Sequence, residues 1–138
     1  MAAAGYSGTP LPRKLGIKPG AVLLLDGSPA GFEIPGLPDG VVIQRTPDPD
    51  DPFDVGVWFP SDRAELESRL AWLRAAMDQA AGLWLVWPKK AARIPTDLSE
   101  NVVREVALPT GLVDNKVCAI DETYSGLRLV IRRELRRG

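Results

Sequence analysis

The sequence predicts an α/β domain with a compact, mostly parallel sheet that ends in a C-terminal antiparallel hairpin. In the middle of the chain, short apolar runs bounded by Gly and Pro alternate with segments of helical spacing, as in strands joined by crossover helices. The last two apolar runs follow each other with no helix between them, which favours antiparallel pairing. The length of 138 residues fits one domain, which we expect over residues 1–138.

The first half of the chain predicts three strands separated by turns. Residues 1–20 form an N-terminal segment, in which a short helix that begins at Pro10 and ends at Gly16 packs on the sheet. The segment 27–40 holds too many Pro and Gly residues for a long crossover helix. The three strands are expected at residues 21–25, 41–44 and 54–59.

An apolar stripe at helical spacing predicts a long helix over residues 62–81, with Gly82 as its stop. A strand over residues 83–87 follows, and its two apolar faces suit a central position in the sheet. The stripe consists of Leu66, Leu70, Leu73, Met77 and Ala80.

The last part of the chain predicts one more helix and the hairpin. Asp97 and Glu100 have the spacing of a capping pair, which opens a helix over residues 97–108. Strands over residues 115–120 and 127–132 then form the hairpin.

Composition excludes several kinds of chemistry. The chain has no His, which removes the commonest general base and metal ligand. Cys118 is the only Cys, so we expect neither a disulfide nor a metal site, and its apolar surroundings predict a buried thiol. The net charge of −1 does not favour a nucleic-acid partner. The sequence shows no signal peptide and no membrane span, so we expect a cytoplasmic protein.

Five sequence blocks resemble a family of bacterial proteins that is known only as a domain of unknown function. The resemblance covers nearly the whole chain and implies no established activity and no catalytic residue. The blocks are GYSGTPL (5–11), KLGIKPG (14–20), LWLVWPKK (83–90), DLSENVVRE (97–105) and KVCAIDETYSGLR (116–128).

The strand order and the turn after the first strand also resemble Rossmann-like methyltransferases, with departures at the cofactor positions. Ser28 and Ala30 carry Cβ atoms where such a turn has glycines, and Pro29 lacks an N–H donor. The second strand ends in Gln44-Arg45-Thr46, where the methyltransferases place an acidic residue for the ribose hydroxyls. We therefore expect no adenosyl cofactor in this chain.

Ligand-binding candidates follow the strands that should lie at the centre of the sheet. Asp26 and Ser28 come after the first strand, and Lys89 and Lys90 come after the strand over residues 83–87. Because ligands of open α/β sheets bind at the carboxyl ends of the strands, we expect Asp26, Ser28 and Lys89 to share a crevice. The lysines would hold an anionic group there. Alternatively, Asp26 is a turn residue and the lysines are only solvated.

Further candidates lie outside this crevice. We expect the region of Tyr6 to lie near it, and Asp97 is a binding candidate unless it only caps a helix. Trp72 lies off the apolar stripe, so it marks either an interface or the core.

A basic face is expected on the last strand. Arg128 and Arg132 share one side of it, which could bind phosphate or an acidic partner, or be a charged edge strand in solvent. The acidic turn over residues 48–51 could meet this face in a homodimer.

The leading interpretation is a non-enzymatic binding or regulatory module on a methyltransferase-like scaffold, with a small molecule or a protein as partner. The altered glycine turn and the absence of His and metal ligands favour it. The alternative is a small-molecule transferase that uses the strand-end crevice.

Overall fold

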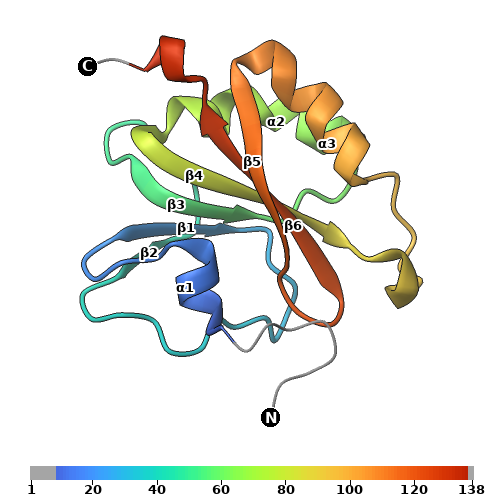
Figure 1. Ribbon diagram of the computed structural model, residues 1–138, viewed down its shortest axis with the longest axis horizontal. Coiled ribbons are helices and arrows are strands. Elements are labelled where there is room, and N and C mark those ends of the chain that lie inside the picture. Colours follow the sequence, from blue (N-terminus) through green and yellow to red (C-terminus); the bar gives the residue numbers. More distant parts are fainter. Residues whose placement is uncertain (1–8, 137–138) are drawn as a thin grey trace.

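The computed structural model describes residues 9–136 and contains a six-stranded sheet covered on both faces (Figure 1). The strands follow the order β2-β1-β3-β4-β6-β5, in which β2, β1, β3 and β4 pair in parallel and β6 is antiparallel to both neighbours. This arrangement confirms the α/β class, the mostly parallel sheet and the terminal hairpin. The strands are β1 (Val22–Asp26), β2 (Val42–Gln44), β3 (Phe53–Trp58), β4 (Met77–Pro88), β5 (Leu112–Ala119) and β6 (Tyr124–Ile131).

Two helices cover one face of the sheet, and a short helix with a long loop covers the other (Figure 1). α2 (Arg63–Ala75) and α3 (Glu100–Ala107) lie on the first face, and α1 (Leu11–Leu15) lies on the second. Residues 27–41 contain no helix, as their Pro and Gly content predicts. Three 3-10 turns complete the described chain: η1 (Lys90–Ala92), η2 (Leu108–Thr110) and η3 (Arg133–Leu135).

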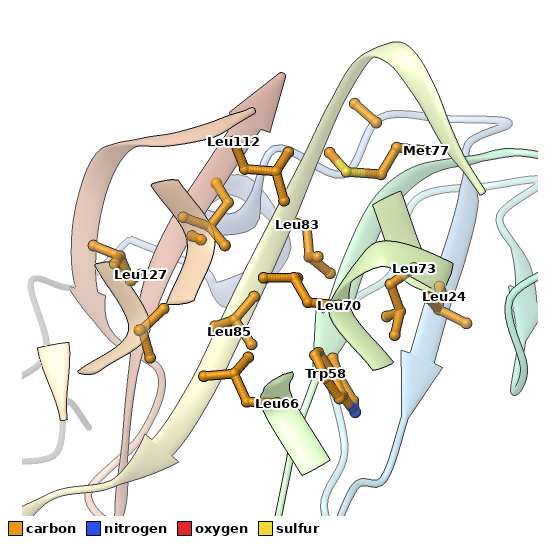
Figure 2. Close-up of a cluster of buried hydrophobic side chains, with 14 of the residues drawn as sticks. Leu24, Trp58, Leu66, Leu70, Leu73, Met77, Leu83, Leu85, Leu112 and Leu127 are labelled. Carbon is orange, nitrogen blue, oxygen red and sulfur yellow. The ribbon is translucent and has the colours of Figure 1, made fainter. Parts of the chain in front are cut away.

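Alternation along the strands sends apolar side chains into two separate cores. On the α2 side, Leu24 and Leu83 pack with Leu70 in a fully buried cluster (Figure 2). On the α1 side, Trp84 is also fully buried, and its indole N–H donates to the Leu15 carbonyl at 3.1 Å. That hydrogen bond fixes the end of α1 to the centre of the sheet. None of the helices within residues 9–136 has the length and apolar character needed to cross a membrane.

The long helix ends six residues earlier than the apolar stripe predicts. α2 stops at Ala75, and the chain enters β4 because the Phe53 N–H donates to the Ala76 carbonyl at 3.0 Å. Met77 pairs with Phe53 and is buried in the same core as α2, so its apolar character belongs to a strand. The prediction of a helix over residues 76–81 was wrong, because spacing alone does not separate a buried strand from a helix.

The start of β4 is irregular, and this places Gly82 inside the strand. Met77 lies opposite Phe53, yet Gly82 lies opposite Val55, so β4 carries extra residues over this stretch. Gly82 is therefore not a helix stop.

The third helix begins later than expected and has a different cap. Ser99 is its N-cap, and the Ser99 hydroxyl accepts from the Val102 N–H at 3.3 Å. The Asp97 carboxylate instead accepts the Arg63 N–H at the start of α2, at 2.8 Å. The prediction that Asp97 and Glu100 cap one helix was wrong, because Asp97 serves a neighbouring helix.

The hairpin strands begin earlier than predicted, at Leu112 and Tyr124. β6 lies between β4 and β5, so the interpretation of the last strand as a charged edge strand was wrong. Arg132 follows the end of β6 and is exposed, whereas Arg128 lies in the middle of the strand.

Candidate functional site

The carboxyl ends of β1, β3 and β4 meet at one edge of the sheet, because these strands are parallel neighbours. Asp26 ends β1, and Lys89 follows the end of β4, with β3 between them. The two predicted residues therefore share an edge. Their side chains have different surroundings, which are described in turn.

Asp26 is held by an arginine of α2. The Asp26 carboxylate accepts from Arg69 at 2.8 Å, and the two side chains are only 13% and 25% exposed. The Arg69 guanidinium also lies over two tryptophan rings, 5.4 Å from the centre of Trp58 and 4.8 Å from that of Trp72. The Asp26 carboxylate is thus paired within the fold, with Arg69 on the α2 side of the sheet.

Arg69 is the partner of Asp26 that sequence reasoning missed. Trp72 follows it by three residues on α2, so both lie on one helix face, and this spacing was the available signal. Trp72 is 44% exposed and stacks with Arg69, so it lies at the surface and not in the core.

The turn after β1 is shaped by packing against β3. Gly27 has φ of +73°, and a Cβ at this position would lie 2.7 Å from the Phe59 carbonyl oxygen. The Pro29 carbonyl accepts from the Phe32 N–H at 3.1 Å, which closes the turn. Ser28 is half-buried in this turn, and its role in binding stays a prediction.

Lys89 and Lys90 line a hollow of about 720 Å³ beyond the end of β4. This strand-end hollow is open to solvent and is lined by the exit of β4, the start of α3 and side chains of the terminal hairpin. The Lys89 N–H donates to the Thr123 carbonyl at 2.8 Å, which ties the lysine backbone to the hairpin turn. Asp26 and Ser28 do not line the hollow. Its other polar residues are Thr96, Ser99, Glu100, Asn101 and Ser125.

The acidic residue of the hollow is paired within α3. Glu100 forms an ion pair with Arg104, which also bonds Asp114 at 3.0 Å. Hydrogen bonds to Asp114 and then to Glu100 raise the pKa of Arg104. With Glu100 paired, the two lysines set the local charge of the hollow.

Two predicted features complete the account of the candidates. Tyr6 lies outside residues 9–136, so its position is not described. Asp97 lies next in sequence to Thr96 and Leu98, which line the hollow, but its carboxylate is bound at the start of α2.

The strand order and the parallel centre of the sheet define a Rossmann-like α/β fold of the kind found in methyltransferases. No protein-family model and no curated protein matches the chain. The comparisons therefore do not confirm the predicted resemblance to a bacterial family of unknown function.

Solved structures of methyltransferases share the fold at low sequence identity. A magnesium protoporphyrin IX methyltransferase from Synechocystis with bound SAM superposes with a TM-score of 0.59, at 14% identity, over 88% of this chain and 74% of that one. A SAM-dependent methyltransferase from Aquifex aeolicus gives a TM-score of 0.53, at 15% identity, over 86% and 87% of the two chains. A putative type 11 methyltransferase from Sulfolobus solfataricus gives 0.50, at 12% identity, over 93% of each. The likeness establishes a methyltransferase-like scaffold.

The residues at the carboxyl ends of β1 and β2 do not fit an adenosyl cofactor. No helix follows the turn after β1, so no helix N-terminus faces it. Phe32 packs on Phe59 with ring centres 4.9 Å apart, and Phe59 packs on Tyr124 at 5.3 Å, so aromatic rings fill this side of the edge. The Gln44 amide nitrogen is bound to Asp51, while its Oε1 is buried without a partner. Of these groups, only the Gln44 Oε1 could accept a hydrogen bond from a ribose hydroxyl.

Proposed function

We propose that this chain is a small-molecule transferase that binds an anionic substrate in the strand-end hollow. The observation that carries the proposal is a hollow with two lysines at the carboxyl end of β4, in a sheet with the fold of methyltransferases. In open α/β sheets, ligands bind outside the carboxyl ends of the strands. The structural neighbours favour this alternative over a non-enzymatic module.

The dimensions and lining of the hollow suit a small ligand. Its volume of about 720 Å³ falls in the range of roughly 300–1,000 Å³ that small-molecule sites occupy. Trp87, only 8% exposed, supplies an apolar wall. Lys89 supplies a cation, and Asn101 and Ser125 supply hydrogen-bonding groups to orient a substrate. A substrate with a carboxylate or a phosphate group would be complementary to this cation and these hydrogen-bonding groups.

The donor in this proposal is not S-adenosylmethionine bound after β1. A ligand at about 100 times its Kd stabilises a fold by roughly 2.7 kcal/mol, which raises the Tm of a domain of this size by on the order of 10 °C. We expect no such rise with millimolar S-adenosylmethionine. A saturable rise of several degrees that unrelated nucleosides do not produce would reinstate that cofactor.

A binding module is the second candidate function. The specific observation that favours it is the Asp26–Arg69 pair, which leaves no free carboxylate at the end of β1 for acid–base chemistry. Such a module would bind the same anionic ligand without converting it.

One experiment separates the two candidates. The protein is incubated with a small-molecule extract of its own host, and mass spectrometry follows which compounds are consumed, formed or retained. A transferase forms many product molecules per protein molecule, and the Lys89→Gln variant forms at least about 10-fold less product, because a lost charged contact costs about 1.5–3 kcal/mol. The matched control is Arg45→Gln, which removes one positive charge from an exposed side chain beyond β2. Retention of a ligand without turnover would support the module and refute the transferase.

A further inference from the structure

A second basic region lies on the α1 side of the sheet, away from the strand-end hollow. Arg128 of β6 is about half-buried there, and among residues 9–136 no carboxylate forms an ion pair with it. It sits beside Trp84 of β4, its partner across the two strands. A partly buried guanidinium with no counter-charge is unusual, because buried charges are normally paired.

The sheet makes room for this guanidinium at Gly82. A Cβ on Gly82 would lie 2.6 Å from the Arg128 Cζ, so only glycine leaves the arginine where it is. Gly82 of β4 thus forms a cradle for the head of Arg128.

Other cations surround the same place. Arg13 and Lys14 of α1, with Lys116 of β5 and Arg128, line a hollow of about 270 Å³, which we call the α1–β6 hollow. Within the described part of the chain, no acidic residue lines it. A neighbouring hollow shares Arg128 and adds Lys18 and Asp54, and the Asp54 carboxylate accepts from the Val22 N–H at 2.8 Å.

The pairing of the hairpin places a second cation on the same face of the sheet. Lys116 lies opposite Arg128 across β5 and β6, and both residues line the hollow. Burial first, and then the charge of Arg136, lower the pKa of Arg128. An anion in the hollow would supply the counter-charge that no carboxylate among residues 9–136 gives to Arg128.

We propose that the α1–β6 hollow binds the phosphate group of a small molecule. Arg128 supplies a planar fork that matches two phosphate oxygens, and Arg13, Lys14 and Lys116 complete the positive field. A volume of about 270 Å³ lies just below the usual range of small-molecule sites of roughly 300–1,000 Å³. The hollow therefore suits a phosphoryl or pyrophosphoryl group whose remainder extends into the neighbouring hollow.

Titrations with inorganic phosphate and with pyrophosphate, at constant ionic strength, test the proposal on the full chain. We expect a saturable rise in Tm with pyrophosphate that phosphate reproduces more weakly. Arg128→Gln should weaken binding about 10-fold or more, since bonds to charged groups contribute about 1.5–3 kcal/mol. Gly82→Ala should weaken it too, because the new Cβ displaces the guanidinium. Lys116→Gln changes an exposed side chain, so it tests the site without threatening the fold.

The control and a second readout keep the test decisive. Arg45→Gln removes the same charge from an exposed arginine beyond β2, at the other edge of the sheet, and should bind pyrophosphate as the unaltered protein does.

The reactivity of Cys118 gives the second readout. Burial raises the pKa of the Cys118 thiol, and the charges of Lys14 and Lys116 lower it by a smaller amount. A bound anion should cancel their influence and slow Cys118 alkylation. No saturable response to either anion, or an equal response from Arg128→Gln, would overturn the proposal.

Discussion

The ion pair between Asp26 and Arg69 decides whether the end of β1 is structural, and a double-mutant cycle measures it. The variants are Asp26→Ala, Arg69→Met and the double substitution, and urea unfolding gives the free energy of each. Exposed helix pairs contribute about 0.3–0.5 kcal/mol, whereas removing one partner of a buried pair costs about 3–5 kcal/mol. With side chains 13% and 25% exposed, we expect a coupling energy between these limits, of about 1–2 kcal/mol.

The protein supplies a matched control on the same helix. Arg63 and Glu67 form a pair at 3.0 Å, with side chains 40% and 53% exposed, so solvent screening should make its coupling energy smaller than that of Asp26 and Arg69. A coupling for Asp26 and Arg69 no larger than that of the control would refute the structural role. Greater stability of the Asp26→Ala protein would also refute it, because functional carboxylates are often held at the expense of stability.

Three further predictions follow from particular positions. Leu70→Ala and Leu73→Ala should each lower the free energy of unfolding by roughly 2–5 kcal/mol, because both side chains are fully buried; urea melts showing under about 0.5 kcal/mol, the scale of surface changes, would contradict their placement. Gly27→Ala should lower the Tm, because the added Cβ would strike the Phe59 carbonyl oxygen in a left-handed conformation, and an unchanged Tm would show that the turn relaxes. Cys118 is half-buried and not fully buried as its apolar surroundings predict. Burial still raises its pKa, so Cys118 should react slowly with iodoacetamide at pH 7, and the rate should increase only above the pH range in which an ordinary thiol ionises. Rapid reaction at pH 7 would contradict the raised pKa.

The sequence predicted the architecture because strand patterns and turn residues are local signals. The parallel centre and the hairpin follow from where helices separate the apolar runs, and the structure confirms both. The end of α2 was missed because Met77 faces the same core as the helix, so periodicity continues across the boundary. The cap of α3 was misassigned because the partner of Asp97 lies 34 residues away in α2, at a distance no local pattern encodes.

The sequence predicted at which edge of the sheet the candidate residues lie, but not which side chains they contact. Parallel strands bring Asp26 and Lys89 to one edge, as expected from their positions after strands. Alternation decides the rest: Asp26 lies two residues after Leu24 and faces α2 with it, where Arg69 covers the carboxylate. Sequence spacing placed Arg69 and Trp72 on one face of α2 but did not show that Arg69 would reach the Asp26 carboxylate.

The segment between β1 and β2 explains how this chain keeps a methyltransferase-like scaffold without the cofactor cradle. Phe32 and Ile34 from this loop join the core on the α1 side, so the loop covers the sheet as a crossover helix would. Core burial, which stabilises the sheet, requires only apolar contact, whereas an anion site needs N–H groups aligned at a helix start. A Pro- and Gly-rich loop in place of the helix keeps the apolar contact with the core but removes the aligned N–H groups of a helix start. An anionic ligand of the kind we propose would then be held by side chains, and the described residues offer these at Lys89 beyond β4 and at Arg128 on β6.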